Sequence, residues 1–409
     1  MTLTSVSRIL IPAALATLAC SDSSGPGAEP IDALPRQLTA AERKLVAGSN
    51  SFAFDLFREI NNGQKSKNVF ISPLSASMAL GMTANGAAGT TYDAMRSTLR
   101  LGTASKAEVN EGYKSLIALL RGLDNTTDFR IANSIWYEKT FPFNAAFLSE
   151  SKSFFDAEVA GLDFASPSAL TTINSWVNES TASKIPAILD DIDPAEVMFL
   201  INAIYFKSAW QSKFDKAQTV NAPFNAYDGT KPSVPLMNQT ASFKVGSSQS
   251  FVAVDLPYGN SAFTMTVVLP NAGVDVNTVA ASLSDASWNT LTQSLAVQKT
   301  MLSLPRFKLT WSSVLNQELR ALGMGVAFDL ADFTPMSPRG KELSITKVIQ
   351  KTFVDVNEEG TEAAAATSVG VGVTSAPPPI RIDRPFIFVI RERLSGTILF
   401  IGKIAKLPA

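Results

Sequence analysis

The chain of 409 residues contains no histidine and a single cysteine, Cys20. Without histidine, neither a Ser-His-Asp nor a Cys-His nucleophilic site can be built, and zinc sites that depend on imidazole are excluded. One cysteine can form neither a thiolate metal site nor a disulfide within the chain. No glycine-rich phosphate-binding motif stands between a strand pattern and a helix pattern. The sequence therefore predicts a protein that is not an enzyme and that uses no cofactor and no metal.

The chain also lacks an excess of charge of either sign and any long hydrophobic run. Lysine and arginine number 35, aspartate and glutamate 36, and the net charge of −1 argues against nucleic acid as a partner. No apolar stretch reaches the roughly 18 residues that a membrane-spanning helix needs. The adjacent acids Asp190-Asp191 and Glu358-Glu359 are typical of solvated loops. With 46% hydrophobic residues, the chain can bury a large core in one or two domains.

The N-terminus carries the pattern of an export signal. Arg8 is followed by the short apolar stretch 9–19, which ends in small side chains as a secretory signal peptide does. With Cys20 next, residues 1–19 resemble a bacterial lipoprotein signal, and the resemblance implies that Cys20 carries a lipid. Thr17 stands where such signals usually have leucine, so a plain cleaved signal with an incidental Cys20 is the alternative.

Residues 20–40 contain serine, glycine and several prolines, a composition typical of a flexible tether. We therefore expect an exported lipoprotein of the cell envelope, at the outer membrane, in the periplasm or on the cell surface, with a secreted protein as the alternative. Contact with the membrane would be made only through the N-terminal lipid. Several acyl chains would hold the protein firmly, since each buried methylene contributes about 0.8 kcal/mol.

Hydrophobic periodicity predicts helices early in the chain and strands later, which indicates an α+β fold. Apolar residues recur at helical spacing from Val46 to Ile60. Ser72 followed by Pro73 predicts the first residues of a buried helix through Met82. Further helices are expected in 147–157 and 173–177, strands in 197–206, 251–256, 263–269, 301–309 and 352–356, and a strand pair in 386–404 with a turn at 394–396.

The most informative segment is residues 359–374. Its first part, EGTEAAAATS, favours helix, whereas the following VGVGVT alternates apolar and small side chains as a strand does. In a strand, one face would carry only small or β-branched uncharged side chains, which is a face fit for burial. Such a segment suits a loop that later becomes a buried strand, and an ordinary flexible surface loop is the alternative. The buried face would consist of Thr361, Ala363, Ala365, Thr367, Val369 and Val371.

Several motifs, in order along the chain, resemble those of the serpins, a family of serine protease inhibitors. Residues 358–367, EEGTEAAAAT, resemble the hinge of inhibitory serpins. Residues 380–390 are similar to the C-terminal signature of the family, and 395–404 to its last strand pair. Upstream, the matching segments are 68–75, 86–91, 174–185 and 202–210. The resemblance spans roughly residues 41–406.

This resemblance implies a serpin fold with three β-sheets, eight to nine helices and a five-stranded central sheet that can accept a further strand. The serpin domain would cover 41–409, with the reactive-centre loop at about 358–379. A target protease would cut this loop as bait and form an acyl-enzyme. The N-terminal half of the loop would then insert into the central sheet and trap the protease before deacylation.

The family's spacing, counted from both sides of the loop, implies a bait bond between Thr374 and Ser375, with Val373–Thr374 as the alternative. Because Thr374 is small and neutral, it suits the shallow apolar pocket of elastase-like or some subtilisin-like proteases. A trypsin-like pocket would need a cation instead. The implied hinge consists of Glu358, Glu359, Gly360, Thr361, Glu362, Ala363, Ala364, Ala365, Ala366 and Thr367.

The resemblance also implies supporting residues around the sheet. Ser72, Ser75 and Asn202 fall where serpins have a polar cluster beneath the opening sheet, and Gln350 replaces the usual histidine there. An amide can both donate and accept, so a hydrogen-bonded cluster can still form. Trp210 is expected where the loop first enters the sheet, and Arg306 is expected to pair with Glu358 at that point.

Three functions are consistent with these patterns. The first is a monomeric inhibitor that forms a covalent complex with a serine protease, or alternatively with a cysteine protease. The second is a serpin that does not inhibit and acts as a carrier, scaffold or chaperone. Such members tend to have charged or bulky residues or proline in the hinge, so Thr361 and the four alanines argue against it. The third, a lipoprotein hydrolase, is weak without histidine.

Overall fold

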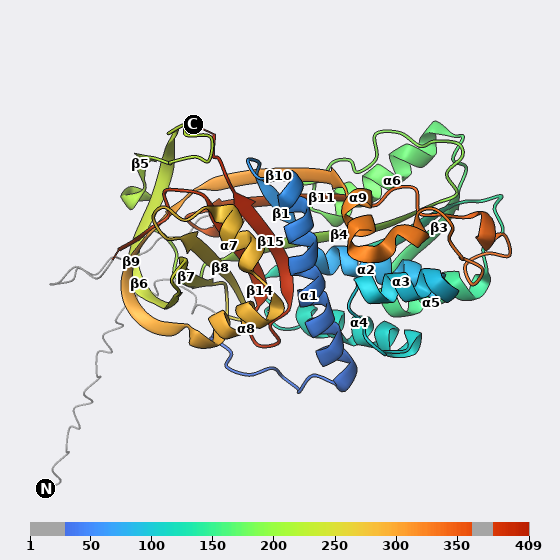
Figure 1. The fold of residues 1–409 in the computed structure, drawn as a ribbon, viewed down its shortest axis with the longest axis horizontal. Helices are drawn as coiled ribbons and strands as arrows, with labels where there is room; N and C mark the ends of the chain where they lie inside the picture. Colours follow the sequence, from blue (N-terminus) through green and yellow to red (C-terminus); the bar gives the residue numbers. More distant parts are fainter. Residues whose placement is uncertain (1–28, 362–378, 409) are drawn as a thin grey trace, which may run out of the picture.

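The computed structural model describes residues 29–361 and 379–408, which form an α+β fold. Figure 1 shows α2 to α5 gathered toward one end of the molecule and most strands of the larger sheet toward the other. In these two ranges the chain forms nine α-helices, which agrees with the expected eight to nine. The helices are α1 (Ala40–Gly63), α2 (Pro73–Asn85), α3 (Gly89–Thr98), α4 (Lys106–Arg121), α5 (Ala145–Phe155), α6 (Pro167–Ser180), α7 (Val276–Ser282), α8 (Asp285–Ser294) and α9 (Asn316–Leu319).

The smaller sheet, which we call the central sheet, has the strand order β10-β11-β12-β4-β2-β3. Five of its members are full strands, and β12 is a two-residue strand between β11 and β4. The expected five-stranded sheet is therefore present, with the beginning of an additional strand already inserted. Its strands are β2 (Asp128–Glu138), β3 (Ala157–Leu162), β4 (Met198–Ala209), β10 (Phe307–Val314), β11 (Ile349–Asn357) and β12 (Gly360–Thr361).

The larger sheet contains nine strands, where the resemblance implied two separate sheets and three in total. The described residues form two sheets, because the long strand β6 pairs with β9 along most of its length and with β5 and β7 at its two ends. The strands are β1 (Val69–Ile71), β5 (Val220–Pro223), β6 (Ser233–Ser247), β7 (Phe251–Pro257), β8 (Phe263–Pro270), β9 (Ala296–Pro305), β13 (Pro379–Arg381), β14 (Phe386–Glu392) and β15 (Ile398–Ile404).

The structure divides one predicted element and shortens another. The run 301–309, predicted as one strand, is divided between the sheets: the Arg306 amide still donates to Pro235 of β6, whereas Phe307 pairs with Val356 of β11. The helix predicted in 147–157 ends at Phe155, because Asp156 adopts a left-handed conformation with φ of 52° and ends the helix.

Local capping explains where the principal helices begin. Thr39 accepts a hydrogen bond from the Glu42 amide and donates its own amide to the Glu42 carboxylate, which is a capping box at the start of α1. Ser72 caps α2 and Pro73 occupies its first position, as the sequence predicted. None of the helices in the described part of the chain is long and apolar enough to cross a membrane.

The first described residues, 29–39, pack on the domain. The Ile31 amide donates to the carbonyl oxygen of Asn260 at 2.9 Å. Ile31 and Leu38 also contact the hydrophobic core. The tether predicted over 20–40 therefore overlaps a segment that is bound to the body of the protein.

Candidate functional site

The central sheet has a gap between β4 and β11. Both strands pair antiparallel with β12, so they run parallel to each other and their C-terminal ends meet there. Because β12 has only two residues, each of these pairings is two residues long. Among the described residues, no ladder joins β4 directly to β11. A longer strand could therefore enter the gap without breaking a ladder between the two.

Gly360 and Thr361 show why the chain can enter the sheet at this point. A Cβ atom on Gly360 would lie 2.1 Å from the carbonyl oxygen of Ser208, so only glycine fits beside β4. Thr361 is 1% exposed, and its hydroxyl is hydrogen-bonded to the hydroxyl of Tyr258 at 2.7 Å. The chain thus enters the sheet at Gly360, and the side chain of Thr361 is already buried there.

Trp210 and Tyr258 support this entry point. Their rings stack with centroids 4.4 Å apart, and the Trp210 indole N–H donates to the carbonyl oxygen of Asn357 at 2.8 Å. Burial raises the pKa of Tyr258 far above its usual range, so its hydroxyl stays protonated beside Thr361. Trp210 lies where the resemblance placed it. Tyr258 was not predicted, because its contact with Thr361 joins residues 103 positions apart in the sequence.

The two glutamates of the hinge are buried and paired, so the prediction that they form a solvated loop is wrong. Glu358 is 1% exposed and Glu359 is 5% exposed. The Glu358 carboxylate lies 2.5 Å from the Arg306 guanidinium, which is the pair that the resemblance implied, and accepts a hydrogen bond from Thr219 at 2.7 Å. Glu359 lies 2.9 Å from the Lys216 ammonium. These ion pairs fasten the chain just before it enters the sheet.

The Glu358 carboxylate should make stability depend on pH. Burial alone raises its pKa, but the hydrogen bonds from Arg306 and Thr219 outweigh burial and hold the pKa below its ordinary value. The ionised group therefore stabilises the fold above its unfolded pKa of about 4.3, and this stabilisation is lost as the pH falls through the lower, folded pKa. We expect acidification below about pH 4.5 to lower the Tm of the wild type more steeply than that of Glu358→Gln.

Thermal unfolding measured in steps of pH tests this expectation. The matched control is Glu111→Gln on an exposed position of α4, which should keep the wild-type dependence. Equal pH dependence in the wild type and in Glu358→Gln would show that the Arg306 pair does not contribute.

A polar cluster connects the gap to the start of α2. The Ser72 amide donates to the side-chain oxygen of Gln350 at 3.1 Å, and the Gln350 amide donates back to the Ser72 carbonyl at 2.7 Å. Ser75 donates to the carbonyl oxygen of Asn202 on β4 at 3.5 Å. The structure thus brings together all four residues that the resemblance grouped. Gln350 uses both its donor and its acceptor, so α2 is linked to β11 without a titratable group.

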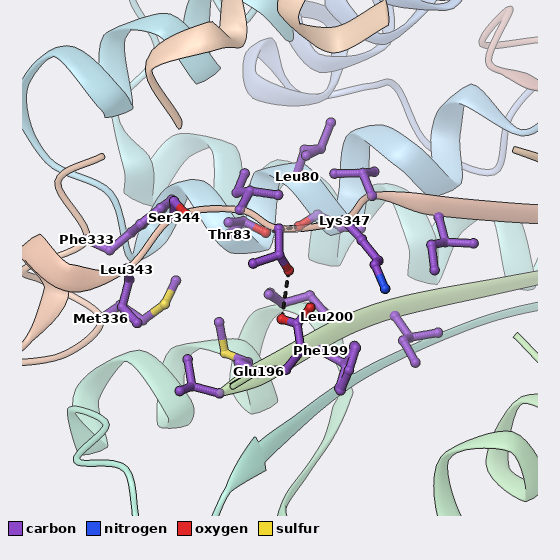
Figure 2. Close-up of a pocket in the computed structure, with 18 of the residues that line it drawn as sticks. Leu80, Thr83, Glu196, Phe199, Leu200, Phe333, Met336, Leu343, Ser344 and Lys347 are labelled. Carbon is purple, nitrogen blue, oxygen red and sulfur yellow. Dashed lines mark hydrogen bonds between the residues drawn. The ribbon is translucent and has the colours of Figure 1, made fainter. Parts of the chain in front are cut away.

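A cavity of about 330 Å³ lies between α2 and the N-terminal ends of β4 and β11. Figure 2 shows Leu80 and Thr83 on the side of α2, Leu200 on the side of β4, and Phe333 and Met336 at one end. Most of the lining side chains are apolar. The cavity therefore leaves unfilled space behind the gap, at the end of the strands that is opposite to β12.

The remaining predicted residues lie outside the described ranges, and their roles stay predictions. In the part of the chain that the structure does describe, no three histidine, cysteine, aspartate or glutamate side chains gather as a metal site would require. The residues outside are the lipid-bearing Cys20, the hinge residues Glu362, Ala363, Ala364, Ala365, Ala366 and Thr367, and the bait residues Val373, Thr374 and Ser375.

Comparison with known proteins identifies the family. A model of the serpins, described as serine protease inhibitors, matches residues 47–407. The chain belongs to the serpin family. The leukocyte elastase inhibitor of Sus scrofa is 37% identical to this serpin over 379 residues, which cover 89% of the chain and 99% of that inhibitor. As the member of a family of inhibitors, this serpin is not an enzyme, in agreement with the absence of histidine.

Solved serpin structures share the fold. Tengpin, a thermophilic serpin in the native state, superposes with a TM-score of 0.82 at 30% identity, covering 93% of this serpin and 97% of tengpin. Thyroxine-binding globulin in complex with thyroxine gives a TM-score of 0.82 at 28% identity and covers 90% of this serpin and all of that chain. These matches confirm the serpin fold that the sequence motifs implied.

Proposed function

We propose that this serpin is a monomeric suicide-substrate inhibitor of serine proteases. The protease would attack the bait bond, Thr374–Ser375 or alternatively Val373–Thr374, and form an acyl-enzyme. The freed N-terminal half of the loop would then enter the gap between β4 and β11 and carry the protease with it. The observation that supports this proposal best is β12, because Gly360–Thr361 already occupies the first two positions of the strand that would insert.

The register of β12 supports the proposed insertion. Thr361 pairs with Ser208, and continuing that antiparallel register one residue at a time would bring Val371 opposite Met198, the first residue of β4. The inserted segment would therefore match the length of β4. Thr361 is buried, and side chains at every second position share its face in a strand. These are the small, uncharged residues Ala363, Ala365, Thr367, Val369 and Val371.

The residues around the bait bond support elastase-like or subtilisin-like targets. Thr374 is small and neutral, and Val373 before it is apolar, so neither a trypsin-like nor a chymotrypsin-like pocket would be filled. The similarity to a protein named leukocyte elastase inhibitor points to the same class. A cysteine protease is the alternative, because it also forms an acyl-enzyme.

A panel of proteases tests the function directly. The serpin is incubated with elastase-like, subtilisin-like, trypsin-like and papain-like enzymes, and the products are separated on a denaturing gel. We expect a complex that resists SDS with at least one of the first two, and a released C-terminal peptide that begins at Ser375. If the serpin is cleaved stoichiometrically but no complex forms and the protease stays active, the result would favour a serpin that does not inhibit, such as a carrier.

We also propose that the protein is exported and anchored by a lipid on Cys20. Residues 1–19 have the charge, apolar stretch and small residues of an export signal, and Cys20 follows directly. In a bacterial host that processes lipoproteins, the wild type should partition into the detergent phase of Triton X-114, and Cys20→Ala should move to the aqueous phase. If both proteins stay in the aqueous phase, Cys20 carries no lipid and the protein is secreted without an anchor.

A further inference from the structure

A hydrogen bond between two side chains closes the gap of the central sheet at the end opposite to β12. The Thr346 hydroxyl donates to the Glu196 carboxylate at 2.7 Å, as the dashed line in Figure 2 shows. Glu196 lies just before β4, which begins at Met198, and Thr346 lies just before β11, which begins at Ile349. The bond therefore joins the two segments that lead into the strands on either side of the gap, and both residues line the cavity behind it.

This bond differs from the other polar contacts around the gap. Ser72 links α2 to Gln350 of β11, and Ser75 links α2 to Asn202 of β4 through a 3.5 Å contact. Neither therefore joins β4 directly to β11. The Lys351 ammonium does reach across to the carbonyl oxygen of Ala187. However, a long lysine side chain can follow a moving partner, whereas a threonine hydroxyl lies one bond from Cβ and cannot.

Insertion of a strand must break the Glu196–Thr346 bond. Thr361 pairs with Ser208, and the same antiparallel register carried on to the cut end of the loop would place Val373 opposite Glu196, so that the inserted backbone would lie between Glu196 and Thr346. A direct 2.7 Å contact between two side chains cannot persist when another backbone lies between them. The bond has an acidic acceptor that is only 9% exposed, and hydrogen bonds to ionised groups are among the strong ones.

We propose that Glu196 and Thr346 form a latch that controls how fast the central sheet opens. The proposal rests on the inhibitory mechanism described above, in which opening of the sheet competes with release of the protease. The two residues are positioning residues, since neither contacts the protease. Loss of the latch should accelerate opening both after cleavage and in the intact protein, where the uncut loop could then insert by itself and end inhibitory activity.

The variant Thr346→Val removes the hydroxyl and keeps the shape of the side chain. Held about 10 °C below its Tm, it should lose inhibitory activity about tenfold faster than the wild type, because breaking one charge-assisted hydrogen bond no longer contributes to the barrier. Residual activity is titrated against the protease identified in the panel. Thr346→Ser retains the hydroxyl and should keep the wild-type rate, and Glu196→Gln, which can still accept a neutral hydrogen bond, should give an intermediate rate.

The matched control is Thr334→Val. Thr334 donates to Asp332 at 2.7 Å, so the same kind of bond is lost at a position that does not line the gap. This control should keep the wild-type rate of inactivation. A second readout separates a latch from a general effect on stability: Thr346→Val should lower the Tm of the intact protein and leave the Tm of the cleaved protein unchanged, because the bond is already broken after insertion.

Two results would overturn the latch. The first is an inactivation rate of Thr346→Val that equals the wild-type rate. If the wild type still forms covalent complexes, the proposed inhibitory function is unaffected by that result. The second is an equal loss of Tm in the intact and cleaved forms, which would show an ordinary structural bond. If the wild type forms no complex with any protease of the panel, the inhibitory function and the latch are both refuted.

Discussion

Cleavage of the reactive-centre loop should raise the melting temperature of this serpin by about 10 °C or more. A strand of roughly ten residues inserted between β4 and β11 would form ladders on both sides, and at about 1 kcal/mol net per hydrogen bond the gain is on the order of 10 kcal/mol. With an unfolding entropy of about 2.1 cal/mol/K per residue, that gain corresponds to a shift of roughly 10 °C in a chain of this size. Calorimetry of the intact and the nicked protein measures it.

The physical reason lies in the proposed mechanism, in which the uncut protein is held in a state that is not its most stable one. Of the described residues of the loop, Gly360 and Thr361 lie between β4 and β11, and the cavity of about 330 Å³ lies at the opposite end of these strands. The cleaved form of Thr361→Arg serves as the control, because it has the same nick but should not insert. If the nicked wild-type protein melts at or below the Tm of the intact protein, the result would contradict a mechanism in which insertion of the loop stabilises the fold.

Thr361→Arg should convert the protein from an inhibitor into a substrate. Thr361 is 1% exposed between β4 and β11, and its hydroxyl contacts Tyr258, so an arginine there would place an unpaired charge inside the sheet at a cost of several kcal/mol. The loop should still be cut, but insertion should be too slow to trap the acyl-enzyme. The number of serpin molecules consumed per inactivated protease should rise by at least about tenfold.

This ratio is measured by titrating a fixed amount of the protease and counting cleaved and complexed serpin on a denaturing gel. The matched control is Thr310→Arg, the same change at an exposed position of β10 in the same sheet. It should inhibit as the wild type does. If Thr361→Arg retains the wild-type ratio, the strand that enters the sheet does not begin at the hinge.

Much of the fold and part of the site could be predicted from the sequence because they depend on local signals or on ordered motifs. Ser72 and Pro73 start α2 as their capping chemistry predicts. The motif around Trp210 placed this residue at the entry to the gap, and the Arg306–Glu358 pair was implied by the same comparison with the family.

Other features depend on contacts between distant segments and could not be predicted. The Tyr258–Thr361 contact and the Glu196–Thr346 bond each join residues more than a hundred positions apart. The burial of Glu359 depends on lysines that follow β4, so its neighbours in sequence suggested a solvated loop. The larger sheet takes the place of two expected sheets because the long strand β6 joins them. The hydrophobic pattern of the sequence did not predict a strand at β6.

If Cys20 carries a lipid as proposed, the attachment of Ile31 to Asn260 would limit how far the protein reaches from a membrane. Tyr258, two residues before Asn260, contacts the hinge, so the fixed part of the N-terminal segment ends near the loop-bearing side of the central sheet. The chain from Cys20 to Ile31 spans at most about 40 Å even when fully extended. A lipid on Cys20 would therefore hold the domain close to the bilayer. The proteases within reach of the bait bond would be those that work near the bilayer surface.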